Sequence, residues 1–500
     1  MDIAGKKIVV MGLGLHGGGL PVAKWFFAHG AEVIVTDLKN REGLLPTLEK
    51  LDAFCRAYRL KHSDKRFISV EYILGRHRES DFCSADIVVQ NPAVPRSSPY
   101  LDIARSANVP IENETSLFFL LTPPIPKIGV TGTRGKSTTT SLLFEMVRRN
   151  IPKAQVTSVA LPSGSQGGFE VIDALLDSAS QSSERPMAVM ELSSWQLEGL
   201  AEHELSPHIA VMTNIFPDHL NRYRDMDEYI DAKKTIYRFQ KSSDSAIFNF
   251  DNSQTRQCGG EQHEGTRYWF SRKNQNIERG TYCSPSVRKP SEDAIWMRDA
   301  DGEHELFFIS DIIPIGEHMI ENVLAASCAA WVAGVRADAI RDAVQNFKGI
   351  PSRLEYIGDV GGRHFYNDTA ATSPEGTIVA LQTLATMPHN ALILIAGGSD
   401  KGLDFSSLAP VISESVSHAV LFTGTATPRL VEALVLAHAP CSIEYAASMK
   451  EAVGKAWQRS REGDILLLSP ASASFGLFIN EFDRGGQFEE CVTILKNEHA

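Results

Sequence analysis

Short apolar runs recur along the chain, and most of them precede a helix-like segment. They are bounded by glycine, proline or aspartate, which is typical of buried parallel strands that alternate with helices. The runs are KIVVMGLG (7–14), AEVIVTDL (31–38), ADIVVQNPAV (85–94), PKIGVTG (126–132), PMAVMELS (186–193), HIAVMTNI (208–215), SAIFNF (245–250), RHFYNDTAA (363–371), ALILIAGG (391–398), SHAVLFTG (417–424) and GDILLLSPA (463–471). They fall into three series, and this grouping predicts three α/β domains.

Two joints separate the three series. The first is the proline-rich LLTPPIPK (120–127), and the second lies near FKGIPSR (347–353). A chain of 500 residues is too long for one core. We therefore expect domains at 1–122, 123–348 and 349–500. The polar residues 251–305 are expected to form peripheral loops or a small antiparallel patch.

The composition is that of an ordinary globular protein, with 43% hydrophobic and 22% charged residues. A net charge of −12 and the lack of a basic run argue against a nucleic-acid partner. The 7 cysteines are scattered singly, which favours reduced thiols over a disulfide framework or a zinc site. No signal peptide is visible and no apolar run approaches the roughly 20 residues of a membrane span, so we expect a cytoplasmic protein without membrane insertion.

The segment VTGTRGKSTTT (130–140) follows an apolar run and precedes a helix-like stretch. Gly132 ends the predicted strand, and Gly135 allows a tight turn before the helix begins. Backbone N–H groups around such a loop converge on phosphate oxygens, and the helix N-terminus adds a partial positive charge. The segment predicts a phosphate-binding loop.

The side chains that follow this loop fit the same interpretation. Lys136 can reach the terminal phosphates of a nucleotide, and the hydroxyl of Ser137 or Thr138 can join a Mg²⁺ shell. The full P-loop pattern has a further glycine five positions before Gly135, where this chain has Val130. The alternative is a plain strand-to-helix turn with an exposed lysine.

A second glycine loop lies near the N-terminus. GLGLHG matches the G-x-G-x-x-G pattern at Gly12, Gly14 and Gly17, and Asp37 ends the next predicted strand. Together they form the dinucleotide fingerprint, with the acidic residue placed for a ribose hydroxyl. Taken alone, this loop indicates a nicotinamide-dependent oxidoreductase. It also fits a turn that only packs a helix on a sheet, or a loop that holds another diphosphate, such as UDP.

Further polar residues follow the predicted phosphate-binding loop in three segments of the chain. MELSSWQLEGL places Glu191 at the end of a buried strand, and TNIFPDHLNRY places His219 just past the next one. A carboxylate and an imidazole beside a P-loop could complete the ligation of a divalent metal bound to ATP. Either residue alone would also fit an ordinary surface role. DEYIDAKKTIY (227–237) predicts a helix with Lys233 and Lys234, which is usually a solvated face.

Seven motifs together resemble the Mur ligases in order and spacing, and they cover nearly the whole chain. They are GVTGTRGKSTTT, ELSSWQLE, NIFPDHLNRY with YIDAKKTIY, GEHMIENVLAA, SRLEYI with YNDTAATSPEGT, GGSDKGLDF, and LLSPASASFGLF with RGGQF. The resemblance implies an N-terminal Rossmann-like domain that binds UDP, a central P-loop domain of the ATPase type with a mainly parallel sheet, and a Rossmann-like C-terminal domain that brings in an amino acid.

The resemblance also implies a reaction. ATP phosphorylates a carboxylate, and an amine then attacks the acyl phosphate; phosphorylation is needed because a carboxylate is a poor electrophile at neutral pH. The motifs fit best the addition of D-glutamate to UDP-N-acetylmuramoyl-L-alanine, in cytoplasmic peptidoglycan precursor synthesis. The implied cofactors are ATP and Mg²⁺, with two ions, and a monomer is expected.

Position within the motifs implies the role of each residue. Residues expected at ATP are Gly132, Thr133, Arg134, Gly135, Lys136, Ser137, Thr138, Asn322, Arg353 and Asp368. Residues expected at the substrates are Leu15, His16, Asp37 and Lys39 for the UDP, and Thr372, Lys401 and Ser474 for the amino acid. Residues expected in catalysis are Lys136, Glu191, His219 and Lys233; of the metal ligands Ser137, Glu191, His219 and Lys233, the last would act as a carbamate. A carbamate turns a cation into an anion, so a lysine can then support a metal ion.

The chain departs from the family pattern mainly in the substrate contacts. No GGNIG-like segment is visible near 156–168, and the usual residues are replaced at Arg134, Met319 and Ala370. The aromatic residue expected to pack on the glutamate falls near Glu481 or Phe482. A related ligase for a different amino acid is therefore the first alternative. The second is the oxidoreductase, which would leave the ATP site unused. The third is a nucleotide-binding protein without catalysis, against which the retained lysines, glutamate and histidine argue.

Overall fold

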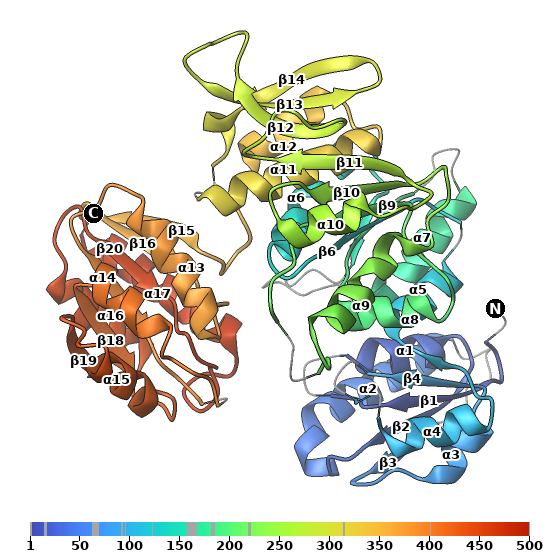
Figure 1. Ribbon diagram of the computed structural model, residues 1–500. Helices are drawn as coiled ribbons and strands as arrows, with labels where there is room; N and C mark the ends of the chain where they lie inside the picture. The colour runs from blue at the N-terminus through green and yellow to red at the C-terminus, as the bar shows by residue number, and fades with distance from the viewer. Residues whose placement is uncertain are drawn as a thin grey trace. The chain divides into compact units, whose positions relative to one another are not determined.

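The chain folds into two compact units in the computed structural model, and each unit is built on β-sheet with helices against it (Figure 1). The structure describes residues 3–14, 18–62, 70–91, 94–95, 97–122, 124–157, 168–181, 186–218, 222–313, 316–400 and 402–499. The first unit comprises described residues within 1–160, 165–311 and 321–344, and the second those within 312–320 and 345–500. Three sheets, two of them in the first unit, confirm the predicted three-domain α/β fold.

The first sheet is parallel throughout, with the strand order β3-β2-β1-β4-β5. Its strands are β1 (Lys7–Met11), β2 (Glu32–Asp37), β3 (Glu71–Leu74), β4 (Ile87–Gln90) and β5 (Ile111–Glu112). Its helices are α1 (Leu20–Ala28), α2 (Arg41–Lys61), α3 (Glu79–Ser84) and α4 (Pro99–Ser106). Alternate residues of β1 face opposite layers: Ile8 and Val10 belong to one core cluster, Val9 and Met11 to another. Burial on both faces explains why β1 is apolar without alternation.

The central sheet has nine strands in the order β14-β13-β12-β11-β10-β9-β6-β8-β7. They are β6 (Lys127–Thr131), β7 (Gln155–Thr157), β8 (Ala188–Glu191), β9 (Ile209–Met212), β10 (Ser245–Asn249), β11 (Thr266–Ser271), β12 (Gly280–Pro285), β13 (Asp293–Asp299) and β14 (Gly302–Phe308). In this order, the strands from β7 through β8, β6, β9, β10 and β11 to β12 run parallel to their neighbours, whereas β13 pairs antiparallel with both β12 and β14. These last strands are the antiparallel patch that was one of two expectations for the polar region.

The helices of the central domain lie around this sheet. They are α5 (Glu114–Leu121), α6 (Lys136–Asn150), α7 (Gly168–Gln181), α8 (Ser194–Ala201), α9 (Met226–Arg238), α10 (Ser253–Gly260), the 3₁₀ turn η1 (Ile309–Asp311), α11 (Glu317–Val332) and α12 (Ala337–Asn346). None of the helices in the described part of the chain combines the length and apolar character that a membrane span requires.

The third sheet has the order β15-β16-β20-β17-β18-β19, with only β15 antiparallel to its neighbour among the described strands. Its strands are β15 (Glu355–Val360), β16 (Arg363–Asn367), β17 (Leu392–Ala396), β18 (His418–Phe422), β19 (Ser442–Ala446) and β20 (Ile465–Leu468). Its helices are α13 (Pro374–Ala385), α14 (Leu408–Ser415), α15 (Thr427–Leu436), α16 (Met449–Arg459) and α17 (Glu481–Glu498). The core clusters hold alternate residues of β20, so the sheet is buried on both faces.

Asn113 joins the first sheet to the helix that follows the candidate Glu191. Its side chain caps α5 by accepting a hydrogen bond from Ser116 N, and its Nδ2 donates to the carbonyls of Trp195 and Gln196 in α8. This approach requires a glycine in α8, because a Cβ at Gly199 would lie 2.1 Å from Asn113 Nδ2. The cap of α5 and the position of α8 are therefore coupled.

We expect Gly199→Ala to destabilise the first unit by about 1–3 kcal/mol, since the methyl group displaces Asn113 and removes its cap. The matched control is Gly454→Ala in α16, where no atom lies within 4 Å of an added Cβ. That change should stabilise the protein by about 0.5–1 kcal/mol, because alanine is the better helix former. Thermal unfolding of both variants checks the pair, and an unchanged Gly199→Ala would contradict the packing argument.

Candidate active site

The loop between β6 and α6 is built on two glycines. Gly132 has φ 150° and Gly135 has φ 79°, both in the region that favours glycine. A Cβ at Gly132 would lie 2.0 Å from Thr213 Oγ1, and one at Gly135 would lie 2.2 Å from Asn322 Oδ1. Both glycines are therefore required by backbone conformation and by close packing.

The end of β9 holds this loop in place. The N–H groups of Thr133 and Arg134 donate to the carbonyl and side-chain oxygens of Asn214, at 2.9 and 2.8 Å. Thr213 Oγ1 donates to the carbonyl of Arg134 at 2.7 Å. Two loop amides are thus engaged within the protein, and the first-turn N–H groups of α6, which lack intrahelical acceptors, are the donors left for a phosphate. Sequence analysis did not single out Asn214.

Two lysine side chains meet at one carbonyl oxygen. Lys136 Nζ donates to the carbonyls of Gly132 and Thr133, both at 3.0 Å, and Lys233 Nζ donates to the carbonyl of Gly132 at 3.0 Å. Lys233 comes from α9 and is only 1% exposed, with its Nζ 4.7 Å from the centre of the Tyr229 ring. The Tyr229 hydroxyl lies 3.2 Å from Thr133 Oγ1, so the ring is itself tied to the loop.

Burial shifts the protonation of Lys233. The pKa of this amine lies well below its usual value, chiefly because burial disfavours the charged form, and secondarily because Lys136 is close; Asp218 acts in the opposite sense. The sequence pattern indicated an ordinary solvated lysine pair at this point in the helix. The structure instead buries Lys233 and leaves Lys234 half-buried against Glu261, with 2.5 Å between Nζ and Oε1.

The remaining candidates in the central domain lie around the same loop. Glu191 ends β8 and stands in register with Val130 of β6, and Ser137 is buried in the first turn of α6. Asn322 of α11 is 5% exposed and accepts a hydrogen bond from Thr139 Oγ1 at 3.3 Å.

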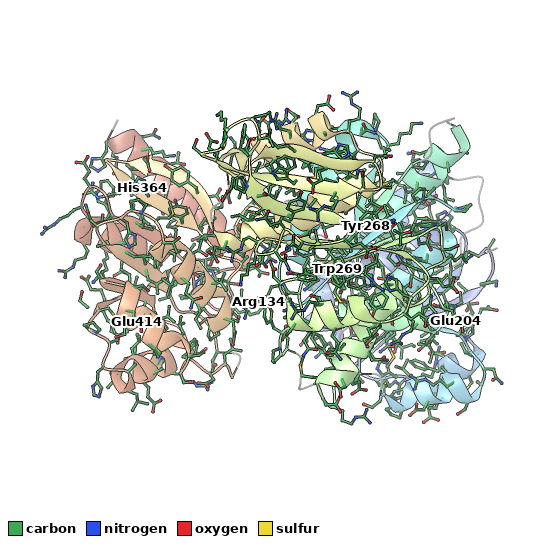
Figure 2. All side chains as sticks on the ribbon, turned by 45° about the horizontal axis from the view of Figure 1, so that its top comes forward. Arg134, Glu204, Tyr268, Trp269, His364 and Glu414 are labelled. Carbon is green, nitrogen blue, oxygen red and sulfur yellow. The ribbon has the colours of Figure 1, made fainter. Side chains whose placement is uncertain are left out.

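Other members of the expected set are less enclosed or lie outside the described residues. Thr138 is half-buried in the first turn of α6. Arg134, labelled in Figure 2, is exposed and lies 5.6 Å from the centre of the Phe216 ring. His219 lies outside the described residues.

No three His, Cys, Asp or Glu side chains in the described part of the chain gather as metal ligands. The oxygen donors that the structure places near the loop include the carboxylate of Glu191 and the hydroxyl of Ser137. Carboxylates, hydroxyls and phosphate oxygens are the ligands that Mg²⁺ accepts when it is bound together with a nucleotide. The donor set therefore fits Mg²⁺ held partly by phosphates.

The N-terminal domain contains a cavity of about 580 Å³ at the carboxyl ends of β1, β2 and β4. The cavity is lined by the predicted Asp37 and Lys39, by Gly12 and Gly14, and by residues that sequence analysis missed, namely Met11, Leu38, His77, Asn91, Val94, Pro95, Ser97, Ser98, Pro99 and Tyr100. Leu15 and His16, also expected here, lie outside the described residues. A cavity of this size suits a nucleotide-sized ligand.

Asp37 ties two loops of this cavity together. Its Oδ2 accepts hydrogen bonds from Leu13 N at 3.0 Å and Gly14 N at 3.4 Å, and its Oδ1 accepts one from Lys39 N at 2.9 Å. Both carboxylate oxygens of Asp37 thus accept hydrogen bonds from backbone N–H groups, whereas the dinucleotide fingerprint predicts an acidic residue that binds a ribose hydroxyl.

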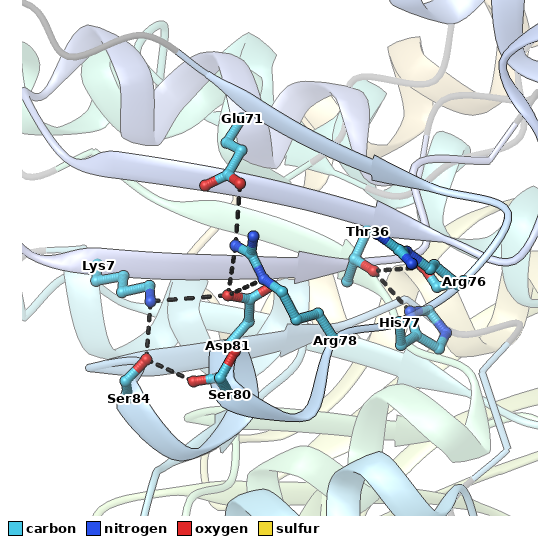
Figure 3. Close-up of polar contacts among 9 residues, drawn as sticks. All are labelled: Lys7, Thr36, Glu71, Arg76, His77, Arg78, Ser80, Asp81 and Ser84. Carbon is cyan, nitrogen blue, oxygen red and sulfur yellow. Dashed lines mark hydrogen bonds and ion pairs between the residues drawn. The ribbon is translucent and has the colours of Figure 1, made fainter.

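His77 contributes an aromatic part of the cavity wall. Its Nδ1 lies 2.6 Å from Thr36 Oγ1, and the same hydroxyl donates to the Arg76 carbonyl at 3.3 Å (Figure 3). The His77 and Tyr100 rings meet edge to face at 4.7 Å between centroids. Burial lowers the pKa of His77 and so favours the neutral imidazole.

In the second unit, Asp368 is buried at the carboxyl end of β16. Its Oδ1 accepts a hydrogen bond from Leu354 N at 3.0 Å, and its Oδ2 accepts one from Ser469 Oγ at 2.7 Å. Burial raises the pKa of Asp368 to about 7. Arg353 is exposed and stands between Ser352 and Leu354, whose φ values of 66° and 45° are rare for residues with a side chain.

The expected amino-acid contacts lie on two loops that follow paired strands. Thr372 comes after β16 and is half-buried, and Ser474 comes after β20, which runs parallel to β16. Ser474 is 2% exposed, and its Oγ makes no hydrogen bond to any described residue. A buried hydroxyl of this kind is costly unless a ligand completes it. Lys401 lies outside the described residues.

Comparison with known proteins relates the whole chain to one family. Residues 6–113 match the MurD-like N-terminal domain of Mur ligases, residues 130–330 the Mur ligase middle domain, and residues 352–472 the glutamate ligase domain of Mur ligases. A protein of Roseiflexus sp. (strain RS-1) named UDP-N-acetylmuramoylalanine--D-glutamate ligase is 40% identical over 496 residues, which cover 98% of this chain and 99% of the relative. One of the same name from Borreliella afzelii (strain PKo) is 33% identical over 497 residues, with 99% of each chain covered.

Solved structures of the same family share the fold. The MurC ligase of Thermotoga maritima superposes with a TM-score of 0.60 at 18% identity, covering 98% of this chain and 99% of that one. A pseudomurein peptide ligase of Methanothermus fervidus gives a TM-score of 0.55 at 16% identity, with coverages of 98% and 100%. At this level of identity the likeness concerns the fold.

We expect Lys233→Met to stabilise the first unit by about 1–3 kcal/mol near neutral pH, because it removes a buried amine while Lys136 still binds the Gly132 carbonyl. The gain has a defined pH dependence. With its pKa depressed in the folded state, wild-type Lys233 costs stability as pH falls below the ordinary lysine value of about 10, and the variant avoids this loss. Lys234→Met is the matched control and should change stability little. Thermal unfolding across pH measures both, and equal behaviour of the two variants would refute the burial argument.

Asp368→Asn should flatten the pH dependence of stability of the second unit. The folded pKa of about 7 lies above the unfolded value. The unfolded state therefore releases its proton first as pH rises. Wild-type stability should fall by roughly 2–4 kcal/mol between about pH 4 and pH 7 on account of this group. Asparagine can still accept from Leu354 N and donate to Ser469 Oγ. Urea unfolding at several pH values compares the slopes; parallel curves would rule out the raised pKa.

Proposed function

The chain belongs to the Mur ligase family, and on this premise we propose that it joins D-glutamate to UDP-N-acetylmuramoyl-L-alanine in an ATP-dependent reaction. The observation that carries the proposal is similarity along the whole chain to ligases of that name, at up to 40% identity. The product is an amide, and the reaction belongs to the synthesis of peptidoglycan precursors. Its nucleotide substrates and its free cysteines favour an enzyme that acts in the cytoplasm, and we propose that it acts as a monomer.

The β6–α6 loop supports the phosphoryl transfer from ATP to the substrate carboxylate. Two anions must approach each other, so positive charge and N–H donors are needed where the phosphoryl group moves. Lys136 and the first-turn amides of α6 supply both. Ser137, Glu191 and His219 are proposed to hold Mg²⁺, with two ions in all. Bound there, Mg²⁺ would neutralise phosphate charge.

The environment of Lys233 supports a carbamate at this position. Its depressed pKa favours the neutral amine, whose lone pair can attack the carbon of CO₂, forming an N–C bond and releasing the proton from nitrogen. The resulting anion would lie beside Lys136 and close to the proposed metal site. Carbamate formation would thereby place an anion beside Lys136, where the amine of Lys233 was neutral, and so create an attractive contact.

The other candidates divide between the substrates. We propose that the cavity of the N-terminal domain binds UDP, with Asp37 fixing the loop and Lys39 beside the phosphates; Leu15 and His16, which follow Gly14 in the sequence, are proposed as further contacts to the UDP. Residues proposed at ATP are Gly132, Thr133, Arg134, Gly135, Thr138, Asn322, Arg353 and Asp368. Residues proposed at the glutamate carboxylates are Thr372, Lys401 and Ser474. The proposed domains are 1–122 for UDP, 123–348 for ATP and 349–500 for the amino acid.

ATP-dependent phosphate release with UDP-N-acetylmuramoyl-L-alanine tests the function. The assay compares D-glutamate, L-glutamate and no amino acid, and mass spectrometry identifies the amide product. Release that requires both the nucleotide substrate and D-glutamate supports the proposal. Release with another amino acid would mean that the protein is a ligase of the same family with a different amino-acid substrate. Absence of release with every pair overturns the catalytic assignment.

Replacement of Lys233 tests the carbamate. Lys233→Ala should lower turnover by roughly 10²–10³-fold, because it removes the charge that supports the metal site, and added formate or acetate should restore part of the rate. Lys234→Ala, one position along α9, is the control and should keep its turnover. Full activity of Lys233→Ala, or its rescue by chloride as well as by carboxylates, would exclude a carbamate at this position.

A further inference from the structure

Arg484 bridges two loops of the second unit, the loop after β16 and the loop after β20. It lies in the first turn of α17 and is fully buried. Its Nε donates to Thr369 Oγ1 at 3.0 Å and its Nη2 to the Thr369 carbonyl at 2.9 Å, while Nη1 donates to the Ser472 carbonyl at 3.1 Å. One guanidinium group therefore sets the distance between the loop after β16 and the loop after β20.

General stability does not explain an arginine at this point. A cation in the first turn of a helix opposes the helix dipole, which favours anions there. The hydrogen-bond acceptors of Arg484 in the described structure are a hydroxyl and two carbonyls, and the carboxylates of Glu481 and Asp368 act only from further away. Burial lowers the pKa of Arg484 to about 10. A buried cation without a directly bonded carboxylate is usually costlier than a well-packed apolar residue.

Close packing makes the bridge rigid. Thr369 Oγ1, which accepts from Arg484, also donates to the Glu481 carbonyl at 2.9 Å. A Cβ at Gly485 would lie 2.6 Å from Thr369 Cγ2, so α17 approaches this threonine closely. The hydroxyl, the guanidinium and the helix start thus form one connected unit, and a shift of Arg484 would move both loops.

The two loops carry the proposed contacts to the amino acid. Thr372 follows Thr369 by three positions, and Ser474 follows Ser472 by two. Ser472 Oγ and Ser474 Oγ are both buried and make no hydrogen bond to any described residue, so they lie where a polar ligand would complete them. A dicarboxylate bound by both loops needs them at a fixed separation, since its two ends are joined covalently.

We infer that Arg484 is a positioning residue for the amino-acid site: it holds the loops of Thr372 and Ser474 at the separation that the carboxylates of the incoming amino acid require. The inference rests on the proposed function and adds a residue that acts through Thr369 and Ser472 without touching the substrate. Loss of the bridge would weaken amino-acid binding, and it would leave the proposed UDP site, which lies on loops of the first unit, largely unchanged.

The experiment compares four variants of the full chain. Arg484→Met removes all three hydrogen bonds, Arg484→Lys retains a cation, and Thr369→Val removes one acceptor with little change of shape. Arg363→Met is the matched control, because Arg363 also makes three hydrogen bonds, to Ser460 Oγ, Ser460 O and Gly361 O, at 2.8, 3.0 and 3.0 Å. Arg363 begins β16, whereas Thr369 follows the end of that strand, so the control loosens the same unit away from the loops.

The readout is the KM for each substrate, with thermal unfolding beside it. In Arg484→Met the KM for D-glutamate should rise at least about tenfold, with smaller rises in Arg484→Lys and Thr369→Val, while the KM for the UDP-linked substrate stays within about twofold. Arg363→Met should lose stability without this effect. Should Arg484→Met fail to fold, the two milder variants carry the test.

Two results would overturn the inference. One is an equal rise of the KM values for D-glutamate and for the UDP-linked substrate in the Arg484 variants, and the other is the same rise for D-glutamate in Arg363→Met; either would mean that Arg484 serves stability alone. A wild-type enzyme that releases no phosphate with any amino acid would instead overturn the proposed function, and the inference with it. A wild-type enzyme that prefers another dicarboxylic amino acid supports the inference if the KM for that amino acid responds in the same way.

Discussion

The carbonyl oxygen of Gly132 accepts hydrogen bonds from two lysines, and much of the central site depends on this one contact. The loop holds this carbonyl in place because Gly132 adopts φ 150°, which favours glycine, and because the end of β9 fixes the loop through Asn214. Two amines held at one acceptor repel each other when both are charged. Burial decides which of them gives up its proton, since Lys233 is enclosed and Lys136 is only half-buried.

The main groups of candidate residues lie at the carboxyl ends of parallel strands. The glycines follow β1, Asp37 ends β2, the phosphate loop follows β6, and the loops of Asp368 and Ser474 follow β16 and β20. Apart from β15, which pairs antiparallel with β16, the sheet neighbours of these strands run parallel to them, so the carboxyl ends meet at one edge of each sheet. A polar site can form at such an edge because the loops there are not buried between the helices that cover the sheet.

The sequence predicted the parts of the fold that depend on burial. β1, β6 and β17 are buried on both faces of their sheets, so each appears in the sequence as a continuous apolar run. β5 has only two residues, and β3 and β19 lie at sheet edges with half-exposed side chains, so the sequence contains no apolar run that predicts them. The glycine loop was predictable because backbone conformation restricts it to glycine. Asn214, His77 and Arg484 were missed because their importance comes from partners distant in the chain. A single polar residue in the sequence does not reveal such partners.

The enclosure of Lys233 also acts as a filter on chemical access. Its amine lies beneath the Tyr229 ring with 1% of the residue exposed, while the neighbouring Lys234 keeps 23% of its side chain exposed. Acylating reagents and other bulky electrophiles therefore meet Lys234 first. Exposure of the nitrogen thus sets the selectivity between these two adjacent lysines, even though the depressed pKa of Lys233 favours its neutral, nucleophilic amine.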